Sequence, residues 1–227
     1  MTIHTLWFED LPSTVPILIA GLAGIAWGFL ADRLAARWPA HEDGSIRPID
    51  WRTPAVMVVG GVAFAASVAR FETDARSLLL IGAYVAALVV LFATDLDQRL
   101  LPDPITLPLI LLAGIVTLTG ASPYVRTNDE LLWALAASAL VPLGLFLLAL
   151  PFGQGAIGQG DLKLLVSVGL LAGGPNLFYG LVAGALAAGV AVAILVFVRR
   201  LTLKSFVPYG PFLILGTLWV MLGLPQP

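Results

Sequence analysis

Four aspartates stand at the ends of apolar segments, where a charged side chain is costly. Asp95, Asp97 and Asp103 lie in the stretch FATDLDQRLLPDPITLPL, and Asp161 follows two glycines in AIGQGDLKLL. Two carboxylates that share a site suit the hydrolysis of a peptide bond, because close like charges keep a proton on one group while the other activates water. This chemistry requires no cofactor. Two of these four residues are therefore the candidates for a catalytic pair.

Spacing distinguishes Asp95 from Asp97. On one continuous helix the two side chains point about 200° apart, so they cannot both face the interior of a helix bundle. The apolar run LVVLFAT leads directly to Asp95, whereas Asp97 is followed by Gln98 and Arg99. A carboxylate is more costly in the first setting. We therefore expect Asp95 to be one catalytic residue, with Asp161 as its partner from another apolar segment.

The GQGD stretch allows two interpretations. Gly158 and Gly160 provide backbone freedom and room for a peptide chain to approach, and Asp161 would then act on that chain. Alternatively, Asp161 is only the N-cap of the helix that follows. This stretch alone leaves both interpretations open.

Three nearby charges have expected structural roles. Asp103 lies between Pro102 and Pro104 and is predicted to cap a helix that begins with Pro104. Lys163 is expected to face lipid headgroups, the alternative being that it tunes a carboxylate or holds a substrate carbonyl. Asp32 follows a long apolar run and is expected to lie at the membrane interface.

Composition places these residues in a membrane protein. Of the 227 residues, 59% are hydrophobic and 11% charged, against about a quarter charged in a soluble domain. A bilayer core takes roughly 20 apolar residues per helix, so the chain is predicted to form one all-α domain, 1–227, a polytopic bundle of about eight transmembrane helices. The predicted spans are roughly 14–34, 55–70, 76–94, 104–120, 130–152, 161–173, 176–198 and 207–224.

Several other classes are excluded. The net charge of −2 offers no basic surface for nucleic acid. The chain has no cysteine, and its two histidines, His4 and His41, cannot make a zinc site of the usual kind, so no metal site is expected. The opening stretch MTIHTLWFEDLPST carries no Lys or Arg. The first apolar run is therefore expected to be a retained span rather than a signal peptide.

Basic residues predict the orientation, because cytoplasmic loops retain Lys and Arg. Nine of the 12 basic residues fall on the side that the chain reaches after its first span: Arg33, Arg37, Arg47, Arg52, Arg99, Lys163, Arg199, Arg200 and Lys204. That side is predicted to be cytoplasmic, with both termini outside the cytoplasm and the four aspartates at the cytoplasmic end. Residues 37–54 would form a short cytoplasmic loop, too small to fold alone.

Two motifs taken together resemble a known family. The pattern D-x-x-x-x-x-L-P-D-x-x-T-L-P-L over 95–109 and the pattern G-x-G-D-x-K-L over 158–164 are similar to those of the type IV prepilin peptidases, polytopic GxGD aspartyl proteases related in mechanism to preflagellin peptidases and presenilins. The segments at 24–39 and 207–216 add to the resemblance, which implies Asp95 and Asp161 as the catalytic pair. The supporting motif positions would be Pro102, Asp103, Gly158, Gly160 and Lys163.

The segment 37–54 departs from the pattern of this family. Many members insert a larger cytoplasmic domain there, whose paired CxxC motifs bind zinc and which is associated with S-adenosylmethionine-dependent methylation. The loop here has no cysteine. A zinc site of that kind is excluded, and N-methyltransferase activity and a need for S-adenosylmethionine are doubtful.

The resemblance implies an intramembrane aspartyl endopeptidase of a bacterial-type inner membrane, acting at the cytoplasmic face. Its substrates would be type IV prepilin-like precursors, pilins or pseudopilins, with a basic leader, a glycine before the cut and an apolar helix after it. The alternatives are a catalytically inactive membrane assembly subunit and a proton-coupled transporter, which would need further acids across the bilayer. The sequence leaves open the oligomeric state and which aspartate is the general base.

Overall fold

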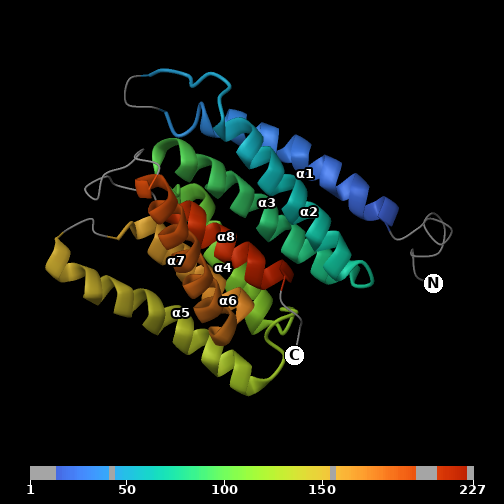
Figure 1. Ribbon diagram of the computed structural model, residues 1–227. Helices are drawn as coiled ribbons and strands as arrows, with labels where there is room; N and C mark the ends of the chain where they lie inside the picture. The colour runs from blue at the N-terminus through green and yellow to red at the C-terminus, as the bar shows by residue number, and fades with distance from the viewer. Residues whose placement is uncertain (1–13, 41–43, 154–156, 198–208, 224–227) are drawn as a thin grey trace.

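The chain folds into a bundle of helices. The computed structural model describes residues 14–40, 44–153, 157–197 and 209–223 (Figure 1). The helices are α1 (Thr14–Ala35), α2 (Arg52–Phe71), α3 (Ala75–Gln98), α4 (Asp103–Leu118), α5 (Asn128–Ala149), α6 (Gln159–Ala172), α7 (Gly174–Phe197) and α8 (Gly210–Gly223). The described residues contain these eight α-helices, a short 3-10 turn at Leu150–Phe152 and no strand. The predicted all-α membrane bundle is confirmed, with each expected span matched by one helix.

The helices fall into two length classes. Helices α1, α2, α3, α5 and α7 are long and apolar enough to cross a membrane. Helices α4, α6 and α8 have 16, 14 and 14 residues, and at 1.5 Å per residue the two shortest reach only about 21 Å, less than the bilayer core of about 30 Å. The short helices carry or adjoin the predicted catalytic motifs.

Helix α3 is the centre of the bundle. It packs against α1, α2, α4 and α8, and Figure 1 shows it between the α1–α2 pair and the group formed by α4 to α8. Its buried residues begin at Ser77 and recur at helical spacing. From Leu88 to Asp95 every residue is buried. Asp74 caps its start by accepting the Ser77 amide at 3.1 Å. Asp95 therefore lies at the end of the most enclosed helix.

Glycines bring α1 and α2 into close contact. A Cβ atom added at Gly28 would lie 2.6 Å from the Val56 carbonyl oxygen, and Gly24 packs against Gly60 in the same way. Small residues allow helix backbones in lipid to approach until van der Waals contacts hold them together. The two helices thus form one closely packed pair beside α3.

Candidate active site

Asp95 lies in the last turn of α3, with its side chain enclosed. The residue is only 5% exposed, and its Oδ2 atom has no hydrogen-bond partner within the described residues. The first residue of α8, Gly210, covers the carboxylate so closely that an added Cβ would lie 2.5 Å from Oδ2. A glycine at this place lets the start of α8 rest directly on the carboxylate.

Asp161 lies in the first turn of α6. The N-cap residue of α6 is Gly158, three residues before Asp161. Its backbone is extended, and no side chain caps the helix there. The N-cap interpretation of Asp161 is therefore wrong. Its Oδ1 atom is buried and has no hydrogen-bond partner in the described part of the chain. Both candidate carboxylates thus have one enclosed oxygen that makes no hydrogen bond to the described residues.

The two carboxylates belong to one site. Asp161 is close enough to Asp95 to act on it electrostatically. Asp161 also acts on Tyr209, which directly precedes α8. Burial raises the pKa of the Tyr209 phenol, and the Asp161 carboxylate shifts the pKa in the same direction. Helices α3, α6 and the start of α8 therefore meet at the pair.

Tyr209 was not among the predicted site residues. Its hydroxyl lies 3.4 Å from the Leu181 carbonyl oxygen of α7. The signal that could have found it is its place in the PYGP segment, whose resemblance to the family was noted but not resolved into residues. Pro208 of that segment lies outside the described residues.

The glycines of GQGD serve packing rather than backbone freedom. Gly158 has φ −65° and ψ 133°, a conformation open to any residue, and an added Cβ there would lie 3.0 Å from Asp161 Oδ2. At Gly160 an added Cβ would lie 2.6 Å from the Leu101 Cβ and 3.0 Å from the Leu101 carbonyl oxygen. The room that Gly160 provides is thus filled by the α3–α4 connection, which corrects the expectation that both glycines make space for a substrate.

Asp103 and Lys163 form an ion pair between the two motifs. Lys163 Nζ lies 2.6 Å from Asp103 Oδ1, and both side chains are partly exposed. Helix α4 begins at Asp103 itself, with Pro102 as an N-cap whose carbonyl oxygen accepts the amides of Ile105 and Thr106 at 3.0 Å. The predicted cap role of Asp103 is wrong. Lys163 thus has a neighbouring carboxylate as its partner, and its expected contact with lipid headgroups stays a prediction.

Asp97 is paired with arginines, unlike Asp95. Its side chain is 1% exposed, with Oδ1 lying 2.7 Å from Arg47 Nε and 2.8 Å from Arg52 Nη1. Burial by itself lowers the pKa of the Arg47 guanidinium, but neighbouring carboxylates, Asp97 among them, raise it above its usual value, so the guanidinium stays charged. The prediction that Asp95 and Asp97 face different surroundings is confirmed.

Asp32 belongs to the same ion network. It is buried, accepts the Thr53 hydroxyl at 2.7 Å and Arg33 Nη2 at 2.6 Å, and pairs with Arg47. Its expected position at the membrane interface stays a prediction, but its carboxylate is enclosed by protein. The network joins α1, α2, α3 and the α1–α2 connection, and it supplies positive partners to Asp32 and Asp97.

Metal ligands are not grouped in the described residues: no three His, Cys, Asp or Glu side chains there could together hold an ion. His4 and His41 lie outside those residues. The groups that the site offers for chemistry are the two carboxylates, with the Tyr209 phenol beside them.

The fold and the site together describe a polytopic membrane protein with a carboxylate pair at one end of its helices. Residues 82–198 match the type IV leader peptidase family, Peptidase_A24. This match covers both Asp95 and Asp161 and spans more than half of the chain. The chain belongs to this family.

Curated relatives carry the name prepilin leader peptidase/N-methyltransferase. The protein from Burkholderia pseudomallei (strain 1026b) is 33% identical over 170 residues, which are 74% of this chain and 54% of that protein. The protein from Aeromonas salmonicida (strain A449) is 31% identical over 135 residues, 60% of this chain and 45% of that protein. The chain thus spans about half the length of the curated relatives it matches. No solved structure matches the chain significantly.

Proposed function

We propose that this chain is an aspartic endopeptidase that removes the leader from prepilin-like precursors. The observation that supports the proposal best is the pair Asp95 and Asp161, a buried and a half-buried carboxylate from different helices. They interact electrostatically, and each has a buried oxygen without a hydrogen-bond partner in the described residues. Membership of the leader peptidase family supports a peptide bond as the bond that is cut.

The proposed mechanism is general acid–base catalysis by the pair. One carboxylate takes a proton from a water that attacks the scissile carbonyl carbon, while the other carboxyl gives its proton to the carbonyl oxygen. The resulting tetrahedral intermediate then collapses. As its C–N bond breaks, the carboxyl that took the proton from water gives it to the leaving amine, and the other carboxylate takes a proton back from a hydroxyl of the intermediate, so the pair ends with the one proton with which it began.

The position of the pair supports action at the cytoplasmic face. Several basic residues lie at the same end of the bundle as the pair. Their ion pairs with aspartates of α1, α3 and α4 place them there: Arg33, Arg47, Arg52 and Lys163. Basic residues collect on the cytoplasmic side of membrane proteins. The substrate would present its leader there and place its apolar helix within the bilayer.

The proposal concerns the peptidase activity alone. The relatives' printed name also includes an N-methyltransferase, but the described residues give no argument for that activity in this chain. No observation favours a proton-coupled transporter either, since the buried acids of the described helices gather at one end of the bundle instead of along a path across it.

The test is a gel-shift assay with detergent-purified protein and prepilin-like precursors encoded in the same genome. Wild type is expected to shorten a precursor, and mass spectrometry of the product should place the cut at the end of the leader. Asp95→Asn and Asp161→Asn should each abolish the shift. The matched control is Asp129→Asn, since Asp129 is exposed in the first turn of α5, and it should cut like wild type.

Two outcomes would contradict the proposal. Substantial cleavage by a folded Asp95→Asn or Asp161→Asn protein would refute the pairing. No cleavage of any precursor by folded wild type would favour the assembly-subunit alternative.

A further inference from the structure

A hydrogen bond between two side-chain hydroxyls lies inside the bundle, away from the carboxylate pair. The hydroxyl oxygens of Tyr84 in α3 and Ser167 in α6 are 2.6 Å apart, and both residues are 0% exposed. A buried hydroxyl without a partner is costly, whereas two apolar side chains of the same shape could fill the same space at little or no cost. Stability alone therefore does not explain why this place holds two polar groups.

The contact joins the two helices that carry the candidate aspartates. Tyr84 precedes Asp95 in α3 by 11 residues, which is about three turns, so both residues lie on the same face of that helix. Ser167 follows Asp161 in α6 by six residues, about 9 Å along the axis. The hydrogen bond thus connects the face of α3 that presents Asp95 to the middle of α6.

Apolar packing fills the rest of the space between these helices. Helix α6 packs mainly on α4 and α5, and the described parts of α3 and α6 make no extensive backbone contact with each other. Buried side chains of both helices, such as Leu88 and Leu164, belong to one apolar cluster. Apolar contacts have no preferred direction, whereas a hydrogen bond depends on distance and angle. The Tyr84–Ser167 bond therefore restrains how α6 lies against α3.

Two other contacts hold the ends of α6, but to different neighbours. At its start, Gly160 packs against Leu101 of the α3–α4 connection. Near its end, the Thr117 hydroxyl of α4 donates to the Leu170 carbonyl oxygen at 2.7 Å. The Tyr84–Ser167 bond lies between these contacts along α6 and attaches the helix to α3 itself. The start and the middle of α6 are thus both fixed beside α3, and two fixed points set the direction of a helix.

We propose that Tyr84 and Ser167 are positioning residues, whose hydrogen bond sets the direction of α6 against α3 and so holds Asp161 at its working distance from Asp95. This inference rests on the proposed function. Neither hydroxyl touches the reacting atoms, because Tyr84 lies about 16 Å from Asp95 along α3. The bond acts through the two helices and leaves the chemistry to the carboxylates.

The first experiment measures the helices without a substrate. The chain has no cysteine of its own, so two introduced cysteines can carry spin labels. Leu100→Cys lies just beyond the end of α3 and Gln159→Cys in the first turn of α6, both at exposed positions. The distance distribution between the labels is measured in lipid nanodiscs, with and without Tyr84→Phe. Loss of the hydroxyl should shift or broaden this distribution.

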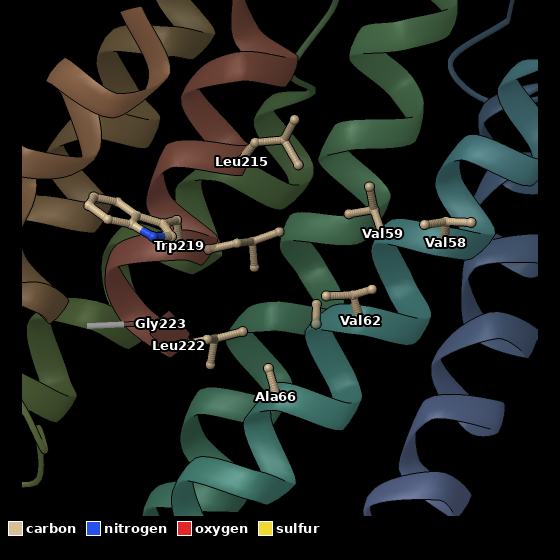
Figure 2. A pocket seen from close by; sticks show the side chains of 10 residues that line it. Val58, Val59, Val62, Ala66, Leu215, Trp219, Leu222 and Gly223 are labelled. Carbon is tan, nitrogen blue, oxygen red and sulfur yellow. The ribbon is translucent and has the colours of Figure 1, made fainter. Parts of the chain in front are cut away.

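The matched control is Tyr124→Phe, the same chemical change elsewhere in the bundle. The Tyr124 hydroxyl donates to the Met221 carbonyl oxygen at 2.7 Å. Met221 lies about 16 Å along α8 from Gly210, which rests on the carboxylate pair. It belongs to the part of α8 that carries Trp219 and Leu222 in Figure 2, where an apolar groove of about 350 Å³ separates α8 from α2. Tyr124→Phe should leave the label distances unchanged.

The second experiment measures cleavage of a precursor at a temperature well below the unfolding midpoint of every variant. Tyr84→Phe should lower kcat about tenfold with KM unchanged, because a small misplacement of catalytic groups costs rate. Tyr124→Phe should keep both constants. Ser167→Ala should lose as much kcat as Tyr84→Phe, and the double variant no more than either, because all three lack the same bond.

The outcomes separate this inference from the proposed function. If Tyr84→Phe keeps the wild-type label distances and the wild-type kcat, the bond is only structural; the inference is overturned and the proposed function stands. If Tyr84→Phe and Tyr124→Phe lose kcat equally, or if the losses of Tyr84→Phe and Ser167→Ala multiply in the double variant, the inference also fails. If folded wild type cuts no precursor, the proposed function fails, and unchanged label distances in Tyr84→Phe would overturn the positioning role independently.

Discussion

Replacing Gly160 by alanine tests how the two motifs are held together. The added Cβ would lie 2.6 Å from the Leu101 Cβ and 3.0 Å from the Leu101 carbonyl oxygen, whereas carbon atoms in contact prefer about 3.5–4.0 Å. The shortfall of about 1 Å falls largely on backbone atoms, which cannot rotate away. Overpacking of this kind costs about 1–3 kcal/mol.

The same displacement reaches the catalytic pair. Asp161 follows Gly160 directly, so an outward shift of the start of α6 moves its carboxylate away from Asp95 by a similar amount. A misplacement of about 1 Å can cost a reaction about 100-fold in rate. We therefore expect Gly160→Ala to lose about two orders of magnitude in kcat while the free energy of unfolding falls by about 1–3 kcal/mol.

The assay measures cleavage of a precursor under saturating conditions together with unfolding in mixed micelles. Gly144→Ala is the control, because an added Cβ at Gly144, within α5, meets nothing within 4 Å. This control should keep full activity and gain up to about 1 kcal/mol of stability from helix propensity. Wild-type kcat in a folded Gly160→Ala protein would refute the argument that Leu101 sets the position of Asp161.

Three further predictions concern charged and polar contacts. Lys163→Asp, which places two negative charges together, should lower the cleavage activity. The double variant Lys163→Asp with Asp103→Lys restores the opposite charges and should regain much of that activity. If it does not, the ion pair is not the cause of the loss. Arg47→Met should lower the free energy of unfolding by up to about 3 kcal/mol, because Asp32 and Asp97 each lose one of their partners but keep others; a cost below about 1 kcal/mol would contradict that. Tyr84→Phe removes the hydroxyl that lies 2.6 Å from Ser167 Oγ in the core and should cost about 1–3 kcal/mol, whereas an unchanged unfolding midpoint would contradict the contact.

Matched variants control these measurements. Arg37→Met removes an arginine whose residue is exposed, so the free energy of unfolding should stay within about 0.5 kcal/mol of wild type. The double variant Tyr84→Phe with Ser167→Ala removes both hydroxyls and should be more stable than Tyr84→Phe alone, because no buried polar group is then left without a partner.

Local information was enough to place the helices. In lipid every backbone amide and carbonyl must be satisfied within its own segment, so an apolar run bounded by charges, Pro or Gly defines a helix without reference to the rest of the chain. The helical periodicity of 3.6 residues also separated Asp95 from Asp97. The structure indeed gives Asp97 two arginine partners and leaves Asp95 Oδ2 without a hydrogen-bond partner in the described residues.

Local rules failed where a distant partner decides. Asp103 has the type and spacing of a helix cap, yet its carboxylate binds Lys163, 60 residues further along the chain. For Asp32, at the end of an apolar run, local rules did not show that Arg47 and Thr53 are its partners. A helix cap and an exposed ion pair each stabilise a protein by about 1 kcal/mol or less. Which of the two interactions a carboxylate makes therefore depends on the partner that the fold brings near it.

The sequence by itself determined that this protein is a membrane bundle of about eight helices, because an apolar run of sufficient length predicts a helix in lipid. It also pointed to a few aspartates at helix ends as the candidates for chemistry, because a charge beside an apolar run is costly in lipid. Only the tertiary structure decided which aspartates are neutralised by arginine or lysine. Pairing depends on distances between residues far apart in the chain, and packing sets those distances at atoms such as the Cα of Gly160 and of Gly210.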